Sequence, residues 1–221
     1  MADSGEFSPK NLFDEYFPLS DDKLALLERF YQIHMNAGLN LTAITTREDF
    51  YKKHLLDSIL LFSDSFYPAG NIADIGSGGG FPGIVIAIVY PETEVTLIDS
   101  IGKKCRFLQD AVEQLGLSNV TVINDRAENI KVKFDMITAR GVAPVKDMLK
   151  WTFALTMENT VMVLYKGEKL EQELKHAQKL LTKKRLKVEN VRYETPIKRT
   201  YSIIHSIDDA FHNLLRRPVK N

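Results

Sequence analysis

The chain has 221 residues, of which 44% are hydrophobic and 26% charged, and this is the composition of a globular protein. Its single cysteine, Cys105, excludes an internal disulfide, and the longest apolar run, residues 83–90, is far too short to span a bilayer. With no signal sequence visible, we expect a soluble protein of the reducing cytoplasm, with no membrane association.

Charge is distributed unevenly along the chain. Residues 1–165 carry 15 Lys and Arg against 22 Asp and Glu, a net charge of −7, whereas residues 166–221 carry 14 against 7, a net charge of +7. Such asymmetry predicts that one end faces a polyanion. A solvated helix face followed by a basic tail explains the charge equally well.

The N-terminal segment predicts two helices. Ser20 can cap the first, acidic residues follow it, and apolar residues recur at helical spacing until Gly38 and Asn40. The second is predicted over about residues 48–62, and residues 68–70 then break the pattern. We therefore expect a helical extension over residues 1–66 and one catalytic domain over residues 67–221.

After this break, strand-like runs alternate with amphipathic segments. Strands are predicted at residues 71–75, 94–98, 120–123, 134–138 and 161–165, and helices at 83–90, 103–115, 144–155 and 169–183. This alternation predicts a mostly parallel, doubly wound α/β sheet. Two last runs, 186–193 and 200–206, have no helix between them and must pair antiparallel as an edge hairpin. That combination resembles the S-adenosylmethionine-dependent methyltransferase fold more than the dinucleotide-binding fold.

A glycine-rich loop, residues 74–83, follows the first predicted strand and opens a helix. Glycines there permit a tight turn and let a ligand touch the backbone. Gly78, Gly80 and Gly83 satisfy the dinucleotide pattern, but Gly76, Gly78 and Gly80, with Asp74 as the acid, satisfy a methyltransferase-like pattern equally well. The loop therefore leaves NAD and S-adenosylmethionine both open.

Polar side chains end the next three strands. Asp99 can accept hydrogen bonds from the ribose hydroxyls of either cofactor, and Ala127 with Glu128 suits an adenine ring and its amine. Arg140 ends the fourth strand, where substrate meets cofactor in open α/β sheets. No Asn/Asp-Pro-Pro-Tyr motif accompanies it, and Cys105 sits on a predicted helix, so neither exocyclic-amine methylation nor covalent cysteine catalysis is indicated.

Several runs together resemble one bacterial family. They are Asn40-Leu41-Thr42, His54-Leu55-Leu56-Asp57-Ser58, the glycine loop with Phe81-Pro82-Gly83, Ile98-Asp99-Ser100-Ile101-Gly102-Lys103-Lys104 with Arg106-Phe107-Leu108, Arg126-Ala127-Glu128, Phe134-Asp135, Thr138-Ala139-Arg140 and Tyr165-Lys166-Gly167. In colinear order over about residues 24–207, they resemble the small-subunit ribosomal RNA guanine-N7 methyltransferases, also called glucose-inhibited division protein B. The tail 208–221 lies beyond the resemblance, and nothing is inferred for it.

The resemblance implies transfer of a methyl group from S-adenosylmethionine to N7 of a guanine in the 530 loop of 16S ribosomal RNA, free or in a small-subunit precursor. By position, it implies cofactor contacts at Gly76, Phe81, Ala127, Glu128 and Arg140. The residue pattern adds Gly78 and Asp99 to these contacts. We expect phosphate contacts from the basic residues of the C-terminal part, Lys183, Lys184, Arg185, Lys187, Arg192, Lys198 and Arg199.

Guanine N7 carries an in-plane lone pair and loses no proton on methylation, so no general base is required and positioning should dominate catalysis. Arg140 is the candidate positioning residue, through the cofactor or guanine O6. We expect His34 and His54 to be structural, with no metal site and no obligate protein partner. The alternatives are an NAD-dependent oxidoreductase, a methyltransferase for another RNA, a protein or a small molecule, and an RNA-binding module with an inactive cofactor site.

Overall fold

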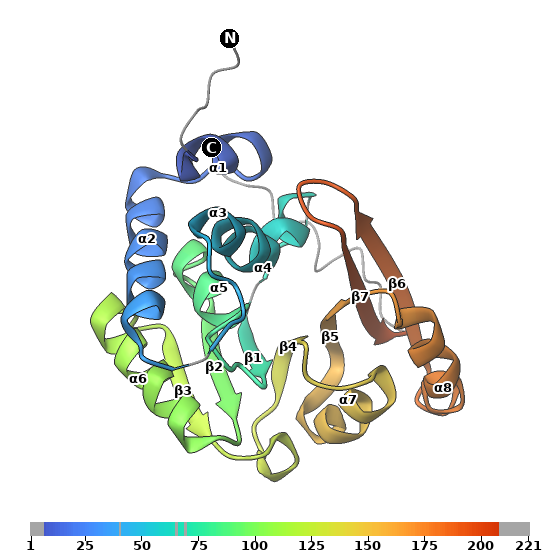
Figure 1. The fold of residues 1–221 in the computed structure, drawn as a ribbon. Helices are drawn as coiled ribbons and strands as arrows, with labels where there is room; N and C mark the ends of the chain where they lie inside the picture. The colour runs from blue at the N-terminus through green and yellow to red at the C-terminus, as the bar shows by residue number, and fades with distance from the viewer. Residues whose placement is uncertain (1–6, 40, 65, 69, 208–221) are drawn as a thin grey trace.

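The computed structural model describes residues 7–39, 41–64, 66–68 and 70–207 (Figure 1). Asn40 and the tail 208–221, both mentioned above, lie outside the described residues. Two helices, α1 (Pro9–Tyr16) and α2 (Asp21–Asn36), come first, and α2 begins after Ser20 as predicted. Ser20 takes the N-cap position, although its side chain makes no capping hydrogen bond.

The second predicted helix is continuous but changes its winding. It runs through α3 (Arg47–Phe50), the π-helical η1 (Tyr51–Leu56), α4 (Asp57–Ile59) and the 3-10 turn η2 (Leu60–Asp64). A π-helical turn widens the helix and is common at functional sites. It lies between Phe50 and Asp57, and it carries His54.

The rest of the described chain forms one sheet with strand order β3-β2-β1-β4-β5-β7-β6. Its strands are β1 (Asn71–Ile75), β2 (Glu94–Asp99), β3 (Val120–Asn124), β4 (Phe134–Arg140), β5 (Thr156–Lys166), β6 (Leu186–Tyr193) and β7 (Arg199–Ser206). The first five pair in parallel, and β7 pairs antiparallel with β5 and β6. The predicted sheet and its terminal hairpin are confirmed. Strand β5 begins five residues earlier than expected, with a bulge opposite β4.

Helices cover both faces of the sheet. They are α5 (Gly83–Val89), α6 (Gly102–Leu115), α7 (Val145–Thr152) and α8 (Leu170–Lys183), with the 3-10 turns η3 (Ala127–Asn129) and η4 (Phe153–Leu155). One hydrophobic cluster joins α5 and α6 to α2 and η1, and the other joins α7 and α8 to the opposite face. Helix α5 is buried along its whole length.

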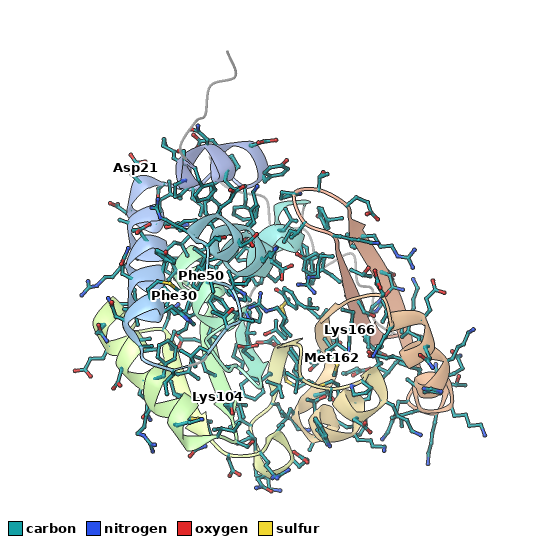
Figure 2. All side chains as sticks on the ribbon, in the orientation of Figure 1. Asp21, Phe30, Phe50, Lys104, Met162 and Lys166 are labelled. Atoms are coloured by element: carbon teal, nitrogen blue, oxygen red, sulfur yellow. The ribbon has the colours of Figure 1, made fainter. Side chains whose placement is uncertain are left out.

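The N-terminal helices pack directly onto the sheet layer. Phe30 of α2 and Phe50 of α3 are fully buried, and Figure 2 shows both in the interior beside the sheet. Their cluster also contains Ile72 of β1 and Ile84 of α5. The division into residues 1–66 and 67–221 stays a prediction, and the two segments share one core.

Candidate functional site

The glycine loop lies between the end of β1 and the start of α5. Gly76, Gly78 and Gly80 all have positive φ, at 66°, 56° and 88°, a conformation that side chains with a Cβ rarely adopt. A Cβ on Gly76 would lie 2.7 Å from Cγ2 of Val142. The amide of Gly76 donates to the carbonyl of Ile98, at 2.7 Å, which ties the loop to β2. The local backbone therefore requires the glycines that the sequence places there.

Asp74 lies beneath this loop rather than in a pocket. Its fully buried carboxylate accepts hydrogen bonds from the amide of Gly83, at 3.2 Å, and the hydroxyl of Thr138, at 3.0 Å. Burial raises the pKa of Asp74 to about 6. The acid of the glycine pattern thus joins the start of α5 to β1 and β4, and it supports the loop from below.

Asp99, at the end of β2, holds the loop from the other side. One carboxylate oxygen accepts from the amide of Gly78 and the other from the amide of Ile101, both at 2.9 Å. Lys104 Nζ lies 3.9 Å from the same carboxylate. A carboxylate has about four acceptor positions, so Asp99 retains capacity for a bound hydroxyl.

A pocket of about 150 Å³ opens at the carboxyl ends of β1, β2 and β3. Four predicted cofactor residues, Gly76, Asp99, Ala127 and Glu128, line it together, along with Ile75, Ile98, Ser100, Asp125, Arg126, Val142 and Trp151. We call it the cofactor pocket. Its apolar walls suit a flat aromatic ring, and its acidic rim suits ribose hydroxyls. The residues that line the pocket therefore fit an adenine nucleoside.

Phe81 does not line this pocket. Its buried ring lies between two imidazoles, with centroids 4.9 Å from His34 and 4.5 Å from His54, and the Arg140 guanidinium carbon lies 4.9 Å from the ring. His34 Nε2 also donates to the carbonyl of Gly79, at 2.7 Å. Phe81 thus packs the glycine loop against the N-terminal helices, and the cofactor contact expected for it stays a prediction.

Both histidines are hydrogen-bonded within the protein. Arg140 donates to His54 Nδ1, at 3.0 Å, so the proton of His54 is on Nε2, which donates to the Thr42 hydroxyl at 2.6 Å. Burial lowers the pKa of His54 to about 3 and that of His34 to about 4. This geometry agrees with the structural roles expected for both residues.

Arg140 belongs to a buried ionic cluster. The carboxylate of Asp57, with no exposed surface, accepts from Arg140 Nη1 at 3.1 Å and from Arg199 Nε and Nη2 at 2.7 and 2.8 Å. Arg140 also donates to the carbonyl of Lys53, at 3.1 Å. Asp57 therefore fixes two cations at the ends of β4 and β7, and neither guanidinium lines the cofactor pocket. We call these three residues the Asp57 cluster.

A second, open depression lies beside the cofactor pocket, at the ends of β4 and β5. Lys53, His54, Arg140, Lys166 and Arg199 are among the residues that line it, and Lys169 lies on its rim. We call it the β4–β5 groove. Val142 lines both hollows, so they adjoin. In open α/β sheets this is where a substrate meets the cofactor, and the lining is rich in cations.

The C-terminal basic residues do not form one patch. The β6–β7 register pairs Leu186 with Ser206 and Tyr193 with Arg199, which places Lys183, Lys184 and Arg185 at one end of the hairpin and Lys198 and Arg199 at the other. Intramolecular ion pairs already engage several of them: Lys187 with Glu189, Arg192 with Glu171, Lys198 with Glu168 and Arg199 with Asp57. The expectation that these residues contact phosphates stays a prediction, and the eight-residue strands β6 and β7 divide them between the two ends of the hairpin.

Asp57 is the main residue that sequence reasoning missed. It lies in the run His54 to Ser58, and the signal that could have identified it was an acid inside an apolar helical stretch.

Within the described ranges, no cluster of three metal-ligating side chains occurs. None of the described helices combines the length and apolarity needed to cross a membrane.

Comparison with known proteins gives concordant matches. The family model described as "GidB: rRNA small subunit methyltransferase G" matches residues 23–200. The Ribosomal RNA small subunit methyltransferase G of Carboxydothermus hydrogenoformans is 37% identical over 195 residues, covering 83% of this chain and 82% of the relative. That of Mycoplasma capricolum subsp. capricolum is 38% identical over 192 residues, covering 84% and 83%.

A solved structure shares the fold at low identity. The O-methyltransferase from Bacillus cereus in complex with SAH superimposes with a TM-score of 0.59 at 17% identity, covering 90% of this chain and 96% of that chain.

Proposed function

Because this chain belongs to the rRNA small subunit methyltransferase G family, we propose that it transfers a methyl group from S-adenosylmethionine to N7 of a guanine in the 530 loop of 16S ribosomal RNA. Family membership makes it an enzyme that methylates small-subunit ribosomal RNA, and this sets aside the oxidoreductase and the inactive RNA-binding module. The cofactor site, the methylated atom and the RNA loop are the proposed part.

The cofactor pocket has the groups that S-adenosylmethionine needs. We assign the ribose hydroxyls to Asp99, the adenine ring to Ala127 and Glu128, and the backbone approach to Gly76. Gly78 does not line the pocket, and its amide donates to Asp99, so its role is to hold that carboxylate in place. The bound cofactor supplies an electrophilic methyl group on a sulfonium. The protein's contribution at this pocket is to hold the nucleoside half rigidly through a loop that Asp74 and Asp99 fix from two sides.

The observation that supports the choice of N7 concerns the one imidazole and the one carboxylate described in the β4–β5 groove, His54 and Glu173, which both already have hydrogen-bond partners. Glu173 accepts from Lys166 Nζ at 2.7 Å and from the amide of Val145 at 3.0 Å. Both nitrogens of His54 are hydrogen-bonded. His54 therefore has no free nitrogen for a proton, and the one carboxylate described in the groove is ion-paired with Lys166, whereas methylation of guanine N7 needs no proton acceptor.

Arg140 can position the base without blocking it. Three of its five N–H donors serve Asp57, Lys53 and His54, which leaves two for a ligand. A bidentate arginine would cover guanine N7 together with O6 and stop the reaction. We therefore assign to Arg140 a single contact with O6, from a guanidinium that the Asp57 cluster keeps from rotating.

The test is product analysis with isotopically labelled S-adenosylmethionine. Small-subunit RNA, as deproteinised RNA and as isolated subunits lacking the modification, is incubated with the enzyme, digested to nucleosides and treated in parallel with borohydride and aniline. The expected product is N7-methylguanosine, with strand cleavage at one guanine. Label on an exocyclic amine, a ribose hydroxyl or a pyrimidine carbon would refute the assignment, and the absence of label from both forms of the small-subunit RNA would favour the alternative substrate class.

A further inference from the structure

Helix α8 carries a row of lysines on its exposed surface. Lys175, Lys179 and Lys183 are spaced four residues apart, so they lie on one side of the helix, and all three are exposed. The row spans about 12 Å, because four residues of α-helix rise about 6 Å. In the part of the chain that the structure describes, none of the three has an ion pair. Figure 1 shows α8 on the outer side of the molecule, beside β6.

The acids of the same helix both lie in its first turn. Glu171 precedes Lys175 by four residues on the same side of the helix, but its carboxylate pairs with Arg192 at 3.1 Å, and Glu173 pairs with Lys166 at 2.7 Å. Like charges four residues apart on a helix repel and destabilise it. No acid of the helix lies between Lys175 and Lys183, so a bound polyanion would reduce the repulsion between these three lysines.

The row leads away from the β4–β5 groove. Lys169, the N-cap residue of α8, lies on the groove rim at the carboxyl end of β5. The helix then runs back along the sheet, away from the groove. Its last residues precede the start of β6, and the start of β6 pairs with the end of β7, at the end of the hairpin farther from the groove. From Lys169 to Lys183 the chain rises about 21 Å, over which one nucleic-acid strand presents several phosphates.

We propose that Lys175, Lys179 and Lys183 form a track that binds phosphates of the ribosomal RNA that flank the methylated nucleotide, with Lys169 at the groove end of the same helix. This proposal rests on the proposed function, because the groove is taken as the entry of the target base. The track differs from the basic set expected from sequence: it runs along a helix, it includes Lys175 and Lys179, and it omits the paired cations of the hairpin. Phosphate contacts of this kind position an RNA without reading its sequence.

The experiment compares two triple variants of the full chain. The track variant carries Lys175→Gln, Lys179→Gln and Lys183→Gln, substitutions that keep helix propensity nearly unchanged. The control variant removes the same number of charges away from α8, with Lys10→Gln on α1, Lys23→Gln on α2 and Lys131→Gln between η3 and β4. Binding to isolated small subunits lacking the modification is measured from about 50 to 300 mM salt, together with kcat, KM and the position of the methyl group.

We expect the track variant to bind about ten- to a hundredfold more weakly at low salt, with a plot of log affinity against log salt flatter by about 2–3 units. KM should rise while kcat at saturating subunits stays within about twofold, because the track touches no reacting atom. The control should match the wild type in slope. The melting temperature of the track variant should equal or exceed that of the wild type, because repulsion is relieved.

Equal affinity and equal slope for the track variant and the wild type would overturn the track, and so would the same loss in the control. Neither result would affect the proposed function if the product were still N7-methylguanosine. Conversely, a wild-type product methylated elsewhere would refute the proposed function, whatever the salt slopes. A probe on the same helix gives a second readout: a hydroxyl-radical source attached through Gln178→Cys should cleave RNA flanking the methylated guanine, and cleavage only at distant sites would also overturn the track.

Discussion

Replacing Asp57 with Asn keeps the shape of a buried side chain and removes the charge that holds two arginines. The carboxylate accepts three charged hydrogen bonds, from Arg140 at 3.1 Å and from Arg199 at 2.7 and 2.8 Å. Asparagine offers one oxygen, and its amide nitrogen would face a guanidinium donor. Breaking a buried ion pair on one side costs about 3–5 kcal/mol. Since the Arg199 side chain is 24% exposed and can be partly solvated, we expect the lower end, about 3 kcal/mol.

Urea unfolding at neutral pH measures this loss, provided that the slope of free energy against urea is unchanged between variants. Asp49→Asn is the matched control, because Asp49 is an exposed acid paired with Lys53 at 2.9 Å, and its loss should stay below about 1 kcal/mol. The double variant Asp57→Asn with Arg199→Gln should lose less than the sum of its single substitutions, because one unpaired cation disappears. A loss for Asp57→Asn no larger than that of the control would show that the arginines do not depend on this carboxylate.

Two further predictions concern the cofactor and pH. Asp99→Asn should raise the dissociation constant of S-adenosylmethionine about ten- to a hundredfold in calorimetry, since charge-assisted bonds are worth about 1.5–3 kcal/mol, and an unchanged constant would place the ribose elsewhere. The free energy of unfolding should fall as pH drops below about 6.5, because His34 and His54 stay neutral when folded, with pKa values of about 4 and 3, but take up protons when unfolded. Each contributes up to about 1.4 kcal/mol per pH unit, and Asp74, with its pKa raised to about 6, opposes them between about pH 4 and 6. His54→Asn should flatten this dependence in urea titrations at several pH values, and a slope equal to the wild type would contradict the buried neutral imidazole.

The alternation of strands and helices was predictable because it depends on short-range patterns. Side chains repeat every second residue in a strand and every 3.6 residues in a helix, and glycine or proline separates the segments. Strands β1 and β6 were predicted with their observed limits. The meeting of Gly76, Asp99, Ala127 and Glu128 also followed from sequence, because parallel strands bring their carboxyl ends to one edge.

The early start of β5 and the π-helical turn were not visible in the pattern. Residues 156–160 are mostly polar, and they join β5 through its pairing with β4 across a bulge rather than through their own propensity. The π-helical turn differs from an α-helix by one hydrogen-bond step, which leaves no distinct spacing of apolar residues over six residues.

Sequence alone therefore determined the sheet, its terminal hairpin, the glycine loop and the acid at the end of β2, since each depends on neighbours along the chain or on the shared edge of parallel strands. Only the tertiary structure decided which charges meet. Asp57 binds Arg140 and Arg199 from 83 and 142 residues away, and the hairpin register separates Lys183 from Lys198. An ion pair forms where folding buries two groups within a few ångströms, and no local pattern encodes that distance.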